Sequence, residues 1–437
     1  MPSIGMVELR NPMAPDHNKD WVQLYKTLEQ NSASDPNAYR QQAAELLDKK
    51  DAPRSKLMLE RHIHANPDDV DALILLAKTC LQLEGGLEEA LVVARKSCNL
   101  ATTPQLRQAA IQVLAVALGR KARSPTLTGS SKASCRQEAI QALQPEASTS
   151  QSSPAAAAAA HYNLSVLHAE AGDASKAADH AKAAMQASAG GASPELHTLS
   201  LVLLALLLSA RGEVQAALSV LSASHQRSHG SSSSSLPTTS PQCEVLVARV
   251  RAQLLHTQGD VAAAMAVLAK VKKQVSAQAG AGEQEAKVWQ ELAQAFAAQG
   301  ALADAFFCSD QSQQLLPWAA STHYVLGCVL EAAGRVEEAT NAYNTALALD
   351  SCHAPSLLRL GTIHRRSGGV SQAAVARDLL TEALRYDPSH AEGWYQLGLA
   401  CKAMHHRADA EQHLHTAVLL AASSPALPYS SLPLLLA

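Results

Sequence analysis

The sequence predicts an all-α protein, an α-solenoid in which antiparallel helix pairs stack into a right-handed superhelix. Two observations lead to this prediction. Residues 288–422 repeat one helix–turn–helix pattern four times, and the whole chain is rich in Ala but only 3% aromatic. Strands favour β-branched and aromatic residues, whereas Ala favours closely packed helices. With 437 residues, the chain is long enough for one extended solenoid.

Small residues recur in two columns of the repeat. The first column holds Ala293, Gly327, Gly361 and Gly398, and the second holds Ala305, Ala339, Ala373 and Ala410. Successive members of the first column are 34, 34 and 37 residues apart. Antiparallel helices approach closely only where the side chains between them are small. A period of 34 residues with small residues early in both helices is typical of tetratricopeptide repeats, so the sequence predicts a tetratricopeptide-repeat α-solenoid.

Large apolar residues and turn residues also have fixed places in the repeat. They are Trp289 and Trp394, four residues before the small column, then Gly300, Gly334 and Gly368, seven residues after it, and Pro317 and Pro388 between copies. A large side chain one turn away fills the groove between helices, Gly ends the first helix, and Pro separates successive helices. The alternative, an irregular Ala-rich bundle, would not produce a fixed step.

The whole chain divides into segments of different composition. We expect a flexible lead-in at 1–20, N-terminal helical repeats at 21–119, a Ser/Pro-rich linker with a short helix (136–143) at 120–154, middle repeats at 155–223, a Ser-rich disordered linker at 224–243, C-terminal tetratricopeptide repeats at 244–422 and a Pro/Leu tail at 423–437. This organisation contains roughly eight helix pairs. In the Ser-rich linker, Ser240 precedes Pro241 and is a candidate phosphorylation site; the alternative is a passive spacer.

The tail carries apolar residues that need cover. Its prolines forbid a further helix, while Leu427, Pro428, Tyr429 and Leu432 form a candidate partner-docking segment. The alternative is a cap laid back on the final repeat, as terminal repeats of solenoids often have.

Charge and cysteine usage limit the classes of function. The formal net charge of −3 does not indicate a large nucleic-acid-binding face. The eight cysteines are scattered without a C-x-x-C motif, and several fall on predicted buried helix faces, as free thiols do in a reducing compartment. The N-terminus lacks the apolar core of a signal peptide. The longest aliphatic run, residues 201–208, is shorter than the about 20 residues that cross a bilayer, so we expect a buried helix and a cytoplasmic protein.

No motif predicts catalysis. The phosphate-binding loop G-x-x-x-x-G-K and the patterns G-x-S-x-G and H-E-x-x-H are absent, and no nucleophile is paired with a base. We therefore predict a non-enzyme without a cofactor. His405, Asp409 and His413 have the i, i+4, i+8 spacing of metal ligands on one helix face. However, His405 falls at a predicted turn, so no metal site is predicted.

The remaining histidines are interpreted as structural or solvated. We expect His62 and His64 on a helix surface, His161 and His323 as packing residues in the column of Trp289 and Trp394, and His406, His413 and His415 at solvated positions.

Peptide binding in the concave groove is the expected function of a tetratricopeptide solenoid. One subclass, the chaperone carboxylate clamp, places Asn directly after the small column. Here those positions hold Gln294, Cys328, Thr362 and Leu399, so the clamp is absent. A helix with Lys270, Lys272 and Lys273 beside apolar residues would suit calmodulin or an anionic lipid; the alternative is the solvated face of a repeat helix.

Three stretches resemble the tetratricopeptide repeat protein 7 family, whose land-plant members are the no-pollen-germination proteins. They are residues 287–347 (KVWQELAQAF to YNTAL), residues 391–429 (AEGWYQLGLA to SSPALPY) and, more weakly, residues 87–101 (LEEALVVARKSCNLA). The likeness corresponds to the C-terminal half of the family. The Ser-Ser-Pro-x-x-Pro-aromatic tail and the polar linker before the last four repeats are its more specific features.

The resemblance implies a scaffold that helps to assemble or localise a phosphatidylinositol 4-kinase at the plasma membrane. It implies a hyccin-like subunit and a lipidated membrane-anchor protein as further partners, and the plant branch adds calmodulin. The chain lacks a counterpart of the family's N-terminal half, and its end (LPLLLA) differs from the family's usual finish. From the repeats alone, the alternative is a generic peptide-binding or calmodulin-binding adaptor.

Overall fold

The computed structural model describes residues 38–436, apart from residues 50, 84, 125–126, 128, 149–153, 189–193, 230–240, 277–281, 299, 422–424 and 428. The predicted lead-in at 1–20 and Ser240 therefore lie outside the described residues. Within the described residues every regular element is a helix, which confirms the all-α prediction. The chain forms two compact units, residues 1–117 and residues 118–437.

The first unit contains antiparallel helices joined by short turns. They are α2 (Ala38–Asp48), α3 (Ala52–Ala65), α4 (Val70–Gln82), α5 (Leu87–Leu100) and most of α6 (Pro104–Ala122). Asp69 begins α4 by accepting a hydrogen bond from the backbone N–H of Ala72. His62, predicted on a helix surface, is instead 2% exposed, and its ring nitrogen Nε2 lies 2.8 Å from the Asp69 carboxylate. The surface prediction is wrong because this partner, seven residues away, allows the imidazole to be buried.

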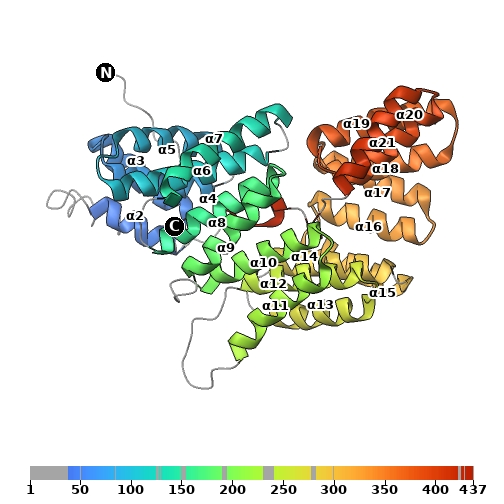
Figure 1. The fold of residues 1–437 in the computed structure, drawn as a ribbon, viewed down its shortest axis with the longest axis horizontal. Helices are drawn as coiled ribbons and strands as arrows, with labels where there is room; N and C mark the ends of the chain where they lie inside the picture. Colours follow the sequence, from blue (N-terminus) through green and yellow to red (C-terminus); the bar gives the residue numbers. More distant parts are fainter. Residues whose placement is uncertain are drawn as a thin grey trace, which may run out of the picture. The chain divides into compact units, whose positions relative to one another are not determined.

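The second unit begins at the end of α6 and continues through fifteen further α-helices among the described residues (Figure 1). These helices are α7 (Gly129–Ser148), α8 (Pro154–Glu170), α9 (Ala174–Ser188), α10 (Pro194–Ala210), α11 (Val214–His229), α12 (Pro241–Thr257), α13 (Val261–Ser276), α14 (Gly282–Ala298), α15 (Leu302–Leu315), α16 (Ala320–Ala332), α17 (Val336–Leu349), α18 (Ala354–Ser367), α19 (Val370–Tyr386), α20 (Ala391–Ala403) and α21 (Arg407–Ala421), followed by the 3-10 turn η1 (Tyr429–Ser431).

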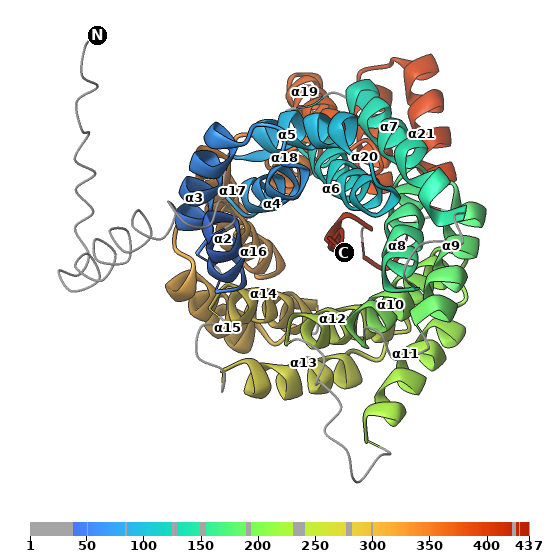
Figure 2. The ribbon, with the colours of Figure 1, turned by 90° about the vertical axis from the view of Figure 1, so that its left-hand side faces the viewer.

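From α8 onward, each helix packs against the next to form antiparallel pairs, and the even-numbered helices also contact one another across pairs. Helices α8, α10, α12 and α14 consequently line the inner side of a curved wall, with α9, α11 and α13 outside it (Figure 2). The inner side of this unit is where a solenoid presents a concave binding surface.

The small columns let the paired helices approach. A side-chain carbon added at Gly327 would overlap the ring of Tyr343, and one at Gly361 would lie 2.7 Å from Leu380 Cγ. A side-chain carbon added at Gly398 would lie 2.8 Å from Leu414 Cγ. The remaining column members, Ala293, Ala305, Ala339, Ala373 and Ala410, are all at most 4% exposed. The column glycines are thus required by close helix contact, with no room for a Cβ atom.

The turn glycines have a different role. Gly300, Gly334 and Gly368 have φ values of 76°, 76° and 80°, in the left-handed region that L-residues with a Cβ rarely adopt. Each lies in the turn after the first helix of its pair. The large-residue positions are occupied by Trp289, which is 5% exposed, and by Trp394, which packs against α20 and α21 neighbours.

Two predicted linkers are more helical than expected. Helix α7 covers Gly129–Ser148, where a loop and a short helix were predicted within 120–154. Ala139, Ile140 and Leu143 on this helix are buried, and the apolar surface that they bury favours helix over the Ser-rich local sequence. The Ser-rich linker (224–243) is likewise shortened from both sides, because α11 extends to His229 and α12 begins at Pro241. The helices therefore exceed the roughly eight pairs predicted.

Candidate peptide-binding surface

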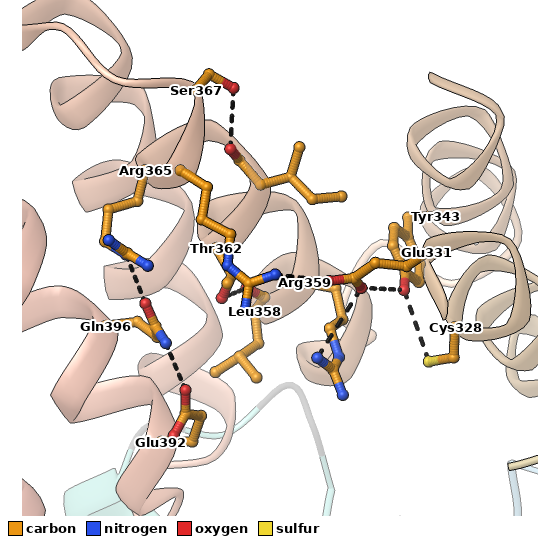
Figure 3. Close-up of polar contacts among 12 residues, drawn as sticks. Cys328, Glu331, Tyr343, Leu358, Arg359, Thr362, Arg365, Ser367, Glu392 and Gln396 are labelled. Atoms are coloured by element: carbon orange, nitrogen blue, oxygen red, sulfur yellow. Dashed lines mark hydrogen bonds and ion pairs between the residues drawn. The ribbon is translucent and has the colours of Figure 1, made fainter. Parts of the chain in front are cut away.

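The inner helices of the C-terminal repeats carry a connected set of charged side chains (Figure 3). Glu331 on α16 is its centre, with a side chain only 15% exposed. Its carboxylate accepts a hydrogen bond from the Tyr343 hydroxyl at 3.0 Å and one from Arg366 Nη1 at 3.2 Å. Arg359 Nη1 lies 3.9 Å from the same carboxylate. One acidic group thus holds two arginines of the next repeat.

A second, separate set of hydrogen bonds joins α18 to α20. Arg365 Nε donates to Gln396 Oε1 at 2.6 Å, and Gln396 Nε2 donates to Glu392 Oε1 at 2.5 Å. Glu331 and Arg365 each follow the small column by four residues, so the repeat places them at equivalent positions on successive inner helices. We call Glu331, Arg359, Arg365, Arg366 and Gln396 the polar row.

The polar row can bind further acceptors. The side chains of Arg359 and Arg366 are 39% and 59% exposed, and a guanidinium carries five N–H donors. Carboxylates and phosphates are the acceptors that such donors bind most strongly, often through two parallel hydrogen bonds. Burial, together with Cys328 and Glu331 nearby, raises the pKa of Tyr343, so its hydroxyl stays protonated and remains a donor to Glu331.

The positions of the chaperone clamp are differently occupied. Thr362 is 3% exposed and donates its hydroxyl to the Leu358 carbonyl of its own helix at 2.8 Å. Cys328 Sγ lies 3.6 Å from the Tyr343 hydroxyl oxygen, and Gln294 is exposed on α14. These side chains do not form the asparagine-lined clamp.

The histidine spacing at the last repeat does not produce a ligand cluster. His405 has a φ of 65°, in the turn between α20 and α21. His413, predicted to be solvated, is half-buried and packs on Trp394 with 5.4 Å between ring centroids. Within the part of the chain that the structure describes, no three His, Cys, Asp or Glu side chains are placed to hold a metal ion.

The tail lies on inner helices far away in the sequence. Leu427 and Leu432 are buried, Tyr429 is half-buried, and Pro428 lies outside the described residues. The Ala426 N–H donates to Ser209 Oγ on α10 at 3.0 Å, and η1 contacts α8. These contacts place the tail on the middle repeats and not as the cap expected on the final repeat.

Side chains that the sequence did not single out hold the tail's main chain. Arg123 Nη1 donates to the Leu432 carbonyl at 2.8 Å, and the Tyr162 hydroxyl donates to the Pro433 carbonyl at 3.0 Å. Asn163 Nδ2 donates to the Leu435 carbonyl at 2.8 Å, and Asn163 Oδ1 accepts from the Leu435 N–H at 2.9 Å. An Asn within the apolar run of α8 was the available signal for a buried polar contact.

The geometry defines a class of protein: a helical-repeat solenoid whose inner face carries charged and main-chain-binding side chains. No protein-family profile matches the chain. The crystal structure of yeast Tom70 superposes with a TM-score of 0.52 at 12% identity, covering 93% of this chain and 89% of that one. This likeness shows the fold, a tetratricopeptide-repeat α-solenoid, as the repeat columns predict.

Sequence comparison gives the relatives. The chain is 27% identical to Protein NPGR2 of Arabidopsis thaliana over 391 residues, 86% of this chain and 50% of that protein. It is 25% identical to Protein NPG1 of the same plant, over 85% of this chain and 52% of that protein. Human Tetratricopeptide repeat protein 7B is 31% identical over 148 residues, 34% of this chain and 17% of that protein. The chain is thus homologous to the plant NPG proteins and to the tetratricopeptide repeat 7 proteins, and it spans about half the length of those plant relatives.

Proposed function

We propose that the chain is a non-enzymatic protein-interaction scaffold that helps to assemble or localise a phosphatidylinositol 4-kinase complex at the plasma membrane. The observation that supports a scaffold is the polar row, which leaves donors of Arg359 and Arg366 available on the inner face. The kinase, the hyccin-like subunit and the membrane anchor follow from the homology to the NPG and tetratricopeptide repeat 7 proteins. None of the described helices is long and apolar enough to cross a membrane.

A calmodulin-binding adaptor is the other function that the sequence suggested, with α13 as the target helix. Leu268 on this helix is 3% exposed and belongs to the core between α12 and α16. A calmodulin target inserts its apolar face into the partner, and Leu268 of α13 is already packed in this core. Lys270 is exposed, while the side chains of Lys272 and Lys273 lie outside the described residues. The scaffold function is therefore the one we retain.

The test is affinity purification of the tagged full chain from its own cells, read by mass spectrometry. We expect a phosphatidylinositol 4-kinase and a hyccin-like protein to co-purify. The variant Arg366→Glu reverses an exposed charge of the polar row and should reduce their recovery several-fold. Arg377→Glu, on α19 beside Asp378, is the matched control and should leave recovery unchanged. Absence of both partners from a folded, wild-type chain would contradict the proposal.

A further inference from the structure

The tail is bound through its main-chain groups, as an extended peptide is bound by a receptor. Four hydrogen bonds, between 2.8 and 3.0 Å, join side chains of α8 and the turn after α6 to the main chain of residues 432–435. Asn163 both donates to and accepts from Leu435, so it pairs with that residue as a neighbouring β-strand would. Recognition through main-chain groups does not depend on the side chains of the segment that is bound.

The side chains that form these bonds are buried with the tail in place. Tyr162 is completely buried and Asn163 is 1% exposed, both on α8, most of whose buried residues are apolar. Within the described part of the chain, the side-chain hydrogen bonds of Tyr162 and Asn163 go to the tail. A buried amide or hydroxyl without a partner costs about 1–3 kcal/mol. The α8 surface therefore favours binding of an extended segment, whose main-chain groups pair with Tyr162 and Asn163, over packing against the apolar face of another helix.

Two leucines give the site its side-chain preference. Leu432 is completely buried and Leu434 is 6% exposed, whereas Pro433 between them is exposed. This alternation is that of an extended strand with one face on the protein. Gly119 on α6 provides the space for Leu434, because a side-chain carbon added there would overlap the leucine. The site therefore selects apolar side chains at every second residue.

The arginine of the site is also held by an acidic side chain. Arg123 Nε donates to Glu170 Oε1 at 2.7 Å, and the Glu170 side chain is only 6% exposed. Arg136 of α7 lies 3.4 Å from the other oxygen of the same carboxylate. An acidic group held between two arginines keeps the Arg123 guanidinium in place, and its Nη1 remains to donate to a carbonyl.

We propose that Gly119, Arg123, Tyr162 and Asn163 form a binding site for an extended partner segment with Leu at alternate positions, and that the tail occupies this site in cis. This proposal rests on the proposed scaffold function and names the class of segment that a partner would insert. A tethered tail acts at an effective concentration of roughly millimolar. A partner segment must therefore outcompete the tail, and release of the tail raises its affinity.

The experiment uses the full chain and a fluorescein-labelled synthetic peptide of residues 425–437. In the released variant, Leu432→Asp and Leu434→Asp are introduced together in the tail. We expect fluorescence anisotropy to show at least tenfold tighter peptide binding to the released variant than to the wild-type chain. Ser430→Asp, at an exposed tail position, is the matched control and should bind as the wild type does.

Two further measurements keep the result independent of folding. Asn163→Ala in the released variant should lose peptide binding at least tenfold, with an unchanged circular dichroism spectrum. A peptide carrying Leu434→Asp should not bind the released variant, and this change alters no residue of the protein. The proposal would be overturned if the peptide bound the wild type and the released variant equally. It would also be overturned if neither Asn163→Ala in the protein nor Leu434→Asp in the peptide weakened binding. Neither outcome bears on kinase co-purification, so the two proposals fail separately.

Discussion

At the scale of single residues, the repeat depends on glycines that perform two unlike tasks. Gly327 has ordinary helical geometry but lies against the Tyr343 ring, whereas Gly334 has a φ of 76° and open space around it. Substitution at the first position is opposed by packing, and substitution at the second is opposed by backbone conformation. The glycines of the small column and the glycines of the turns therefore meet different physical requirements.

We predict that Gly327→Ala lowers the free energy of unfolding by about 1–3 kcal/mol, because the added methyl group forces the Tyr343 ring to shift. The Tyr343 hydroxyl also donates to Glu331, so the shift disturbs the polar row as well. Urea unfolding followed by circular dichroism measures the change. Gly282→Ala, where the added carbon meets open space at the start of α14, is the control and should change stability by less than about 1 kcal/mol. Equal effects at both positions would show that packing is not the cause.

At the scale of elements, the α8–α9 pair contains three neighbouring histidines. His161 Nδ1 and His180 Nδ1 lie 3.1 Å apart, and the rings of His168 and His180 stack with centroids at 5.6 Å. Burial lowers the pKa of each, and the mutual proximity of His161 and His180 lowers the pKa of His161 further. Asp173 and Asp179 oppose this effect at His168 and His180, respectively. The folded pair consequently favours neutral imidazoles.

We predict that acid destabilises this element. A histidine whose folded pKa is lowered binds fewer protons in the folded than in the unfolded state, so stability is full above the unfolded pKa, about 6.5, and falls as pH drops below it. Thermal unfolding from pH 7.5 to pH 5 should show a falling Tm, and His180→Gln should make that fall shallower. His415→Gln, at an exposed position of α21, should leave the pH dependence as it is. A Tm profile that His180→Gln does not alter would contradict the prediction.

Sequence reasoning succeeded where the determinants are periodic and local. The fixed step from Gly327 to Gly361 defines the repeat because each pair imposes the same steric requirement on its own helices. Sequence reasoning failed where a residue contacts a partner that is far away in the sequence or that does not follow the repeat period. Arg123, which donates to the Leu432 carbonyl, lies 309 residues away, and no repeat pattern encodes this contact. The burial of His62 depends on its particular contact with Asp69 and likewise escaped prediction.

At the scale of the whole second unit, the tail adds a link that an ideal solenoid lacks. Solenoid repeats contact only their neighbours, so their stability is approximately a sum of local terms. Tyr162 and Pro433 are 271 residues apart, and Lys132 Nζ donates to the Tyr386 carbonyl across 254 residues. These bonds tie α7 and α8, at the beginning of the unit, to residues in its C-terminal part.

We predict that Leu434→Asp in the full chain raises amide hydrogen exchange in α8 by about tenfold or more, because burial of one leucine contributes roughly 1.5–3 kcal/mol. Exchange in α17 should remain as in the wild type, since a solenoid transmits local opening mainly to adjacent helices. Hydrogen–deuterium exchange read by mass spectrometry separates the two segments, and Ser430→Asp controls for the added charge. If exchange rose equally in α8 and α17, the tail would stabilise the unit cooperatively. If it rose in neither, the tail would contribute no stability to α8, and its main-chain hydrogen bonds would serve recognition without holding the repeats together.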